Sequence, residues 1–123
     1  MSEVVYSTTV TAVGALVPDF REQGILVFFG ENAPEELHEF SILHKVDIHK
    51  RAPIVGDTIA INDDVFTVLA VGSVASDNLM NLGHLDLKAN GLSEADLPGD
   101  VNVELRELPT INVGDRLQVF AKN

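Results

Sequence analysis

The sequence predicts an all-β fold, a single-domain closed or nearly closed β-barrel with one or two short helical turns. About eight stretches have the composition or the alternation of β-strands, and turn residues separate them at intervals of about eight to twelve positions. Helix signals are few. Many short strands with regular turns are typical of a barrel, because closure leaves no unpaired sheet edge.

The first three predicted strands differ in pattern. Residues 4–13 are rich in β-branched side chains, and residues 24–29 form a short apolar run of the kind found in buried strands. Residues 40–48 alternate, so that apolar side chains share one face of a strand. All three lie in the N-terminal half of the chain.

The next two predicted strands form a hairpin. Residues 57–61 and 65–71 flank the turn Asn62-Asp63-Asp64, whose residues favour tight turns. The remaining strands are predicted at residues 84–89, 101–105 and 116–120.

Signals for short helical turns occur at three places. Asn32-Ala33-Pro34-Glu35 offers a capping residue, a proline suited to a first turn and a glutamate at the capping-box position. Residues 76–82 predict a second turn or two, ended by Gly83. The third place is residues 93–96, stopped by Pro98-Gly99.

Length and composition bound the function. A chain of 123 residues is expected to form one domain over residues 1–123. The chain has no cysteine, which excludes thiol catalysis, disulfides and cysteine-based zinc sites. A net charge of −11 disfavours nucleic acid and anionic lipid as partners, since both bind clustered Lys and Arg.

The chain is expected to be soluble and cytoplasmic. Its first residues lack the basic segment and the long apolar segment of a signal peptide. The apolar run at residues 25–29 is too short to span a bilayer.

His44 is the first candidate for chemistry, because alternation places it on the apolar face of its strand with Ile42 and Val46. A histidine there is commonly a core residue bonded to a carbonyl. The functional alternative is a neutral imidazole that has one nitrogen held by a partner while the other attacks phosphorus. Histidine's ordinary pKa near 6.5 supplies that neutral form at cytoplasmic pH.

Positive charge follows His44 closely. Lys45, Lys50 and Arg51 are three of the eight Lys and Arg residues in the chain. They are candidates for phosphate contacts, and the alternative is a solvated polar face. Lys45 would point away from His44 on a regular strand.

The other histidines are weaker candidates. His84 shares the polar face of its strand with Asp86, and is either a surface residue or a partner that orients His44 or contacts phosphoryl oxygens. His38 and His49 are predicted to be solvated. No histidine pair has strong metal-ligand spacing and no Gly-x-Ser-x-Gly motif occurs, so neither a metal site, nor another cofactor, nor a serine hydrolase is expected.

Five segments carry a resemblance that covers nearly the whole chain. They are residues 6–11, residues 33–37, the apolar lead into His44, residues 91–99, and the stretch AVGSVASDNLMNLGHL at residues 70–85. In this content and order the chain resembles the glucitol/sorbitol-specific enzyme IIA component of the bacterial phosphoenolpyruvate-dependent sugar phosphotransferase system.

The resemblance implies an all-β phosphotransferase component with a phosphohistidine intermediate, within a protein-N(pi)-phosphohistidine–sugar phosphotransferase system. Family members accept a phosphoryl group on one histidine from the HPr phosphocarrier protein. They pass it to the IIB component of the IIB/IIC permease, which phosphorylates glucitol during import. The accepting histidine corresponds to His44, and the histidine of the 70–85 stretch is His84. Such a chain would meet the membrane only through the permease.

One alternative function stays open, that of a non-catalytic β-barrel that binds a ligand or regulates another protein. With no Trp and one Tyr, the chain is a poor candidate for a carbohydrate-binding module, since sugar rings commonly stack on aromatic faces. The composition favours a site that docks proteins around a phosphoryl group.

Overall fold

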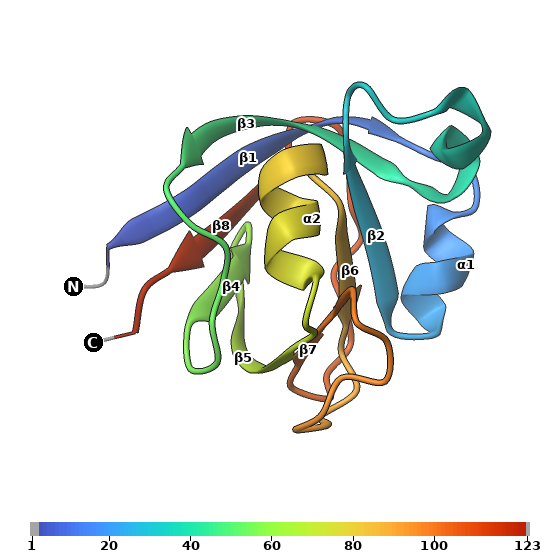
Figure 1. The fold of residues 1–123 in the computed structure, drawn as a ribbon. Coiled ribbons are helices and arrows are strands. Elements are labelled where there is room, and N and C mark those ends of the chain that lie inside the picture. Colours follow the sequence, from blue (N-terminus) through green and yellow to red (C-terminus); the bar gives the residue numbers. More distant parts are fainter. Residues whose placement is uncertain (1–2, 123) are drawn as a thin grey trace.

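The computed structural model describes residues 3–122, which form a closed barrel of eight β-strands with two α-helices and one 3-10 helix (Figure 1). The helical segments are α1 (Val17–Glu22), η1 (Glu35–Phe40) and α2 (Ala75–Leu82). The predicted all-β barrel is confirmed. Its strands are β1 (Val4–Val13), β2 (Ile25–Gly30), β3 (Ile42–His49), β4 (Thr58–Ile61), β5 (Asp64–Val71), β6 (Leu85–Lys88), β7 (Asp100–Val103) and β8 (Arg116–Phe120).

Around the barrel the strands follow the order β1, β3, β2, β6, β7, β5, β4 and β8, and β8 pairs with β1. The pairs β2–β3 and β6–β7 are parallel, and the others are antiparallel. Parallel neighbours cannot be joined by a tight turn, so the chain crosses over through η1 and through residues 89–99. The predicted β4–β5 hairpin is confirmed, with Ile61 opposite Asp64.

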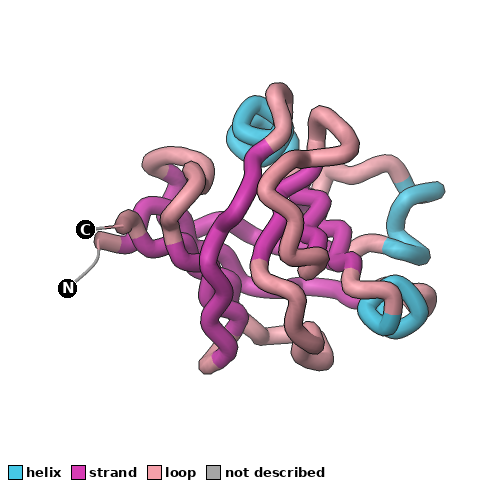
Figure 2. Tube along the Cα trace, turned by 90° about the horizontal axis from the view of Figure 1, so that it is seen from below, coloured by secondary structure: helices cyan, strands magenta, loops and turns pink. Residues whose placement is uncertain are grey.

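Apolar side chains fill the barrel interior, and the helical segments lie at the periphery of the strands (Figure 2). Helix α2 packs on the barrel through Ala75 and Leu79. These contacts fix the C-terminal end of α2, which is followed by Gly83, beside the strands. Fully buried side chains from the strands include Tyr6, Leu26, Phe28, Phe66, Leu87 and Val119.

The pairing of β1 with β3 is interrupted by irregularities that shape the site. Ser7 faces Ile48 but Thr8 faces Val46, so one residue of β3 has no opposite residue. Such a bulge re-aims the neighbouring side chains. Beyond it, Val10 faces His44.

The structure has one helix that was not predicted and lacks one helical turn that was. Helix α1 was not predicted, because it has six residues and Leu16 at its start makes no side-chain capping bond. The helical turn predicted at residues 93–96 is wrong. There the Asn102 side-chain amide donates to the carbonyls of Leu92 and Glu94, which holds the segment as a loop.

Across residues 3–122, no helix combines the length and the apolar character needed to cross a membrane.

Candidate functional site

His44 lies near the start of β3, between Val10 of β1 and Gly30 of β2. Its side chain is 2% exposed, in agreement with the apolar face that alternation predicted. The ring of Phe28 meets the imidazole edge-on, with centroids 5.8 Å apart and planes at 89°. The imidazole is thus part of the barrel interior.

Both ring nitrogens of His44 are hydrogen-bonded. Nε2 lies 2.6 Å from the carbonyl oxygen of Gly83, and Nδ1 lies 2.5 Å from Oγ1 of Thr8. A carbonyl oxygen can only accept, so Nε2 carries the hydrogen. In the neutral ring the lone pair is therefore on Nδ1, and the Thr8 hydroxyl donates to it.

The ionisation of His44 is shifted by its surroundings. Burial lowers the pKa of His44, while the hydrogen bond to Gly83 and the negative charge of Glu31 act in the opposite direction and are outweighed. The imidazole is consequently neutral at pH 7, the form that can act as a nucleophile.

Two glycines allow the backbone to approach the imidazole. A Cβ atom on Gly83 would lie 2.8 Å from the backbone nitrogen of Gly30 and 3.1 Å from Nε2 of His44. Gly83 ends α2 with a φ of 66°, which confirms the predicted helix end. A side chain at position 83 would force its carbonyl away from the ring.

A groove of about 400 Å³ opens beside these glycines. Its walls come from residues 29–34, from residues 79–83, and from Val46 and His49 of β3. We call it the Gly83 groove. The exposed Leu82 and the half-buried Met80 give its rim apolar surface.

Histidines hold three backbone carbonyls around the Gly83 groove. Besides the bond from His44, Nε2 of His38 donates to the carbonyl of Ala33 at 2.9 Å. Nε2 of His49 donates to the carbonyl of Met80 at 2.8 Å. His38 and His49 were predicted only as solvated residues, because backbone acceptors leave no mark in a side-chain pattern.

His84 packs on the other face of β2. Its ring stacks on Phe29 with centroids 4.2 Å apart and planes at 7°, whereas the preceding Phe28 faces His44. Nε2 of His84 lies 3.0 Å from the Asp86 carboxylate, a neighbour on the same strand face. The two histidines are linked through one peptide group, since the Gly83 carbonyl that His44 holds is bonded to the His84 nitrogen.

The basic residues after His44 have other partners. Lys50 pairs with Glu3 at 2.8 Å, and Arg51 donates to both carboxylate oxygens of the buried Asp57, at 2.6 and 3.3 Å. Lys45 is exposed on the opposite face of β3. None of these bonds reaches His44, so a phosphate contact by these residues stays a prediction.

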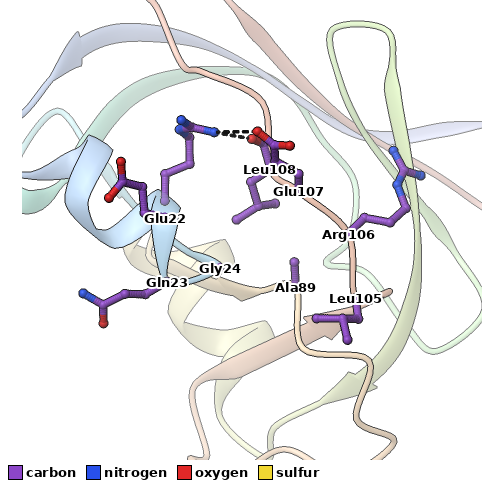
Figure 3. A pocket seen from close by; sticks show the side chains of 9 residues that line it. Glu22, Gln23, Gly24, Ala89, Leu105, Arg106, Glu107 and Leu108 are labelled. Carbon is purple, nitrogen blue, oxygen red and sulfur yellow. Dashed lines mark hydrogen bonds and ion pairs between the residues drawn. The ribbon is translucent and has the colours of Figure 1, made fainter.

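A larger cavity of about 650 Å³ lies between the end of α1 and residues 105–108 (Figure 3). There the Arg21 guanidinium donates to the Leu108 carbonyl at 2.7 Å and lies 3.8 Å from the Glu107 carboxylate. Its charge is already paired, and the residues lining the cavity include no histidine. The Gly83 groove is therefore the candidate site.

Thr8 is the residue beside His44 that sequence reasoning missed. The signal was present, because alternation places this polar residue on the same face of β1 as Tyr6 and Val10. A threonine on an otherwise apolar face needs a buried hydrogen-bond partner. That partner is His44.

Comparisons with known proteins agree on one family. Residues 5–118 match the family model described as "PTS system glucitol/sorbitol-specific IIA component". The glucitol/sorbitol-specific EIIA components of Shigella flexneri and of Escherichia coli K12 are each 41% identical to this chain over 100 residues, which are 81% of this chain and 81% of each relative.

A solved structure has the same fold. The PTS system IIA component from Enterococcus faecalis V583 superimposes with a TM-score of 0.81 at 24% identity, covering 94% of this chain and 99% of that one. The family match extends over most of the barrel that holds His44. The chain therefore belongs to the family of glucitol/sorbitol-specific IIA components of the sugar phosphotransferase system.

Proposed function

We propose that this chain is a phosphoryl carrier in which His44 accepts a phosphoryl group from the HPr phosphocarrier protein. It then passes the group to the IIB component of a glucitol/sorbitol permease. The observation that carries the proposal is the neutral His44 imidazole, fixed through both nitrogens beside the Gly83 groove. The proposal implies a cytoplasmic protein that meets the membrane only through the permease.

Nε2 is the nitrogen that we expect to react. Gly30 and Gly83, which pack at its side, line the groove, whereas Thr8 at Nδ1 is buried in β1. Before transfer, the Gly83 carbonyl has to turn away from Nε2. Glycine suits this movement, since it adopts backbone conformations that other residues avoid.

The transfer step balances in protons and electrons. Before the attack the neutral ring changes tautomer, because Nε2 gives its proton to solvent and Nδ1 takes one up from solvent as the Gly83 carbonyl turns away. The Nε2 lone pair then attacks phosphorus, while the bond from phosphorus to the histidine nitrogen of the donor breaks and its electron pair returns to that nitrogen. Once Nε2 has bonded to phosphorus, the ring with its Nδ1 proton is an imidazolium, and the negative phosphoryl oxygens offset its positive charge. Because such transfer depends mainly on positioning and electrostatics, a rigidly held imidazole suits it.

The rim of the Gly83 groove supports a protein partner. Leu82 and Phe29 give it apolar surface, and Glu31 adds negative charge to a chain whose net charge is −11. We expect HPr to dock here with a face that is apolar at its centre and positively charged around it.

His84 acts in support in this proposal. Its ring is fixed by stacking on Phe29 and by the Asp86 carboxylate. It thereby steadies the peptide whose carbonyl holds His44. We expect it to tune the position of Gly83 rather than to receive the phosphoryl group.

The proposal is tested by incubating the protein with phosphoenolpyruvate, enzyme I and HPr and following its intact mass. One phosphoryl adduct is expected, stable in alkali and lost in acid, as for a phosphorus–nitrogen bond. His44→Gln should give no adduct, whereas the matched variant His49→Gln should still be phosphorylated. If wild-type protein gives no adduct, the chain is a non-catalytic barrel and the proposal is wrong.

A further inference from the structure

We propose that Thr8 is a positioning residue for phosphoryl transfer, one that serves both states of the carrier. Its hydroxyl donates to Nδ1 of the free His44 ring and accepts from Nδ1 when Nε2 bears the phosphoryl group. The inference rests on the proposed function of His44.

In the resting state both side chains of this pair are buried. Oγ1 of Thr8 lies 2.5 Å from Nδ1, and the side chains of Thr8 and His44 are 1% and 2% exposed. The register shift between Ser7 and Thr8 aligns Thr8 with Val46, close to His44 along β3. Because Nδ1 of His44 is buried, its hydrogen bonding depends on the Thr8 hydroxyl.

The chemistry requires a partner that can reverse its role. In the free ring Nε2 donates to the Gly83 carbonyl, so Nδ1 accepts. For Nε2 to attack with its lone pair, the ring hydrogen must reside on Nδ1, and in the phosphoryl-imidazolium that forms this nitrogen is still a donor. A hydroxyl both donates and accepts, so rotation about the Cβ–Oγ1 bond serves each state without movement of heavier atoms.

Substitutions separate this role from packing. Thr8→Val keeps the branched shape but leaves the phosphorylated ring with a buried, unpaired N–H group. Thr8→Ser keeps the hydroxyl. Thr9→Val is the matched control, because the half-buried Thr9 is the adjacent β1 residue and lies opposite Lys45.

The experiment measures two quantities in full-length protein phosphorylated through HPr. The first is the rate of phosphoryl transfer from HPr, which should fall about 10-fold to 100-fold in Thr8→Val. The second is the titration of Nδ1 in the phosphorylated ring, followed by ¹⁵N NMR, whose midpoint should drop by about one unit in Thr8→Val. Thr8→Ser should restore both, and Thr9→Val should change neither.

Different outcomes overturn different claims. If wild-type protein is phosphorylated on His44 but Thr8→Val matches it in rate and in Nδ1 titration, Thr8 has only a structural role and this inference is wrong. A loss of thermal stability in Thr8→Val with an unchanged Nδ1 titration leads to the same conclusion. If wild-type protein is phosphorylated on another residue, the proposed function of His44 fails first, and this inference with it.

Discussion

The carbonyl oxygen of Gly83 lies 2.6 Å from Nε2 of His44, and the missing side chain at Gly83 allows this approach. A helix end and a strand residue 39 positions apart thereby form one structural unit. The unit fixes the ring and the nitrogen that carries its hydrogen. It also places the peptide between Gly83 and His84 at the wall of the Gly83 groove.

Gly83→Ala should break this unit. The new Cβ would lie 2.8 Å from Gly30 while the residue is held at a φ of 66°, so both a clash and backbone strain result. We expect a loss of about 2–4 kcal/mol in the free energy of unfolding, measured with urea, and slower transfer from HPr. Gly114→Ala is the control, because its φ is 92° but no atom lies within 4 Å of a Cβ there. Equal losses in both variants would show that the close approach to His44 is unimportant.

Leu82→Glu should weaken docking of the donor. Leu82 is 57% exposed on the rim of the Gly83 groove, so a charge there should disturb the partner without unfolding the barrel. We expect transfer from HPr to slow by about tenfold, through KM rather than kcat. Leu105→Glu provides the comparison, since Leu105 is 77% exposed beside the other cavity. If both variants slow transfer alike, the groove is not the docking surface.

Stability should decrease as the pH falls below about 6.5. The folded protein resists protonation of His44, whose pKa is lowered mainly by burial, while the unfolded chain takes up that proton at its ordinary pKa. The unfolded state then binds more protons, so the free energy of unfolding drops as the pH approaches the folded pKa. Urea midpoints between about pH 8 and about pH 5 should show a shallower dependence in His44→Gln. If the urea midpoint depends on pH identically in the wild-type protein and in His44→Gln, a lowered pKa of His44 is contradicted.

Asp57→Asn should destabilise the barrel without touching the chemistry. The buried Asp57 carboxylate accepts bonds from Arg51 and from the backbone nitrogens of Ile54 and Lys122. Burial would raise the pKa of Asp57, but these bonds outweigh it and hold the pKa below its ordinary value. We expect a loss of about 2–4 kcal/mol in unfolding free energy with normal transfer from HPr.

The control for Asp57 is Asp115→Asn, because the Asp115 carboxylate accepts one backbone bond, from Asn112, in a comparable Gly-Asp turn. The loss of unfolding free energy in Asp115→Asn should be smaller than the loss in Asp57→Asn. A slower transfer in Asp57→Asn at unchanged stability would instead connect the Arg51–Asp57 pair with the phosphoryl group.

Much of the fold could be predicted from the sequence. Alternation and turn residues identified all eight strands, and Gly83 identified the end of α2, because local geometry determines these features. Helix α1 escaped prediction, since its six residues carry hardly any capping signal. The parallel pairing of β2 with β3 also escaped, because it depends on contacts distant in sequence.

The candidate site was only partly predictable. Alternation placed His44 on the buried face, but no pattern could show which atoms would meet its nitrogens. The clustering of Lys50 and Arg51 after His44 in the sequence could not show that their side chains pair with Glu3 and Asp57. Both residues follow the end of β3 at His49, so they lie six and seven positions beyond His44, which is about 20 Å along an extended chain.

The central claim is that His44 carries the phosphoryl group, and the most direct test is to locate that group by peptide mapping and ³¹P NMR after phosphorylation through HPr. We predict one phosphohistidine, at His44, with phosphorus bonded to Nε2. Phosphorus found on His84, His49, His38 or a non-histidine residue would contradict the claim. Phosphorus on Nδ1 of His44 would keep the carrier but overturn both the approach through the Gly83 groove and the role given to Thr8.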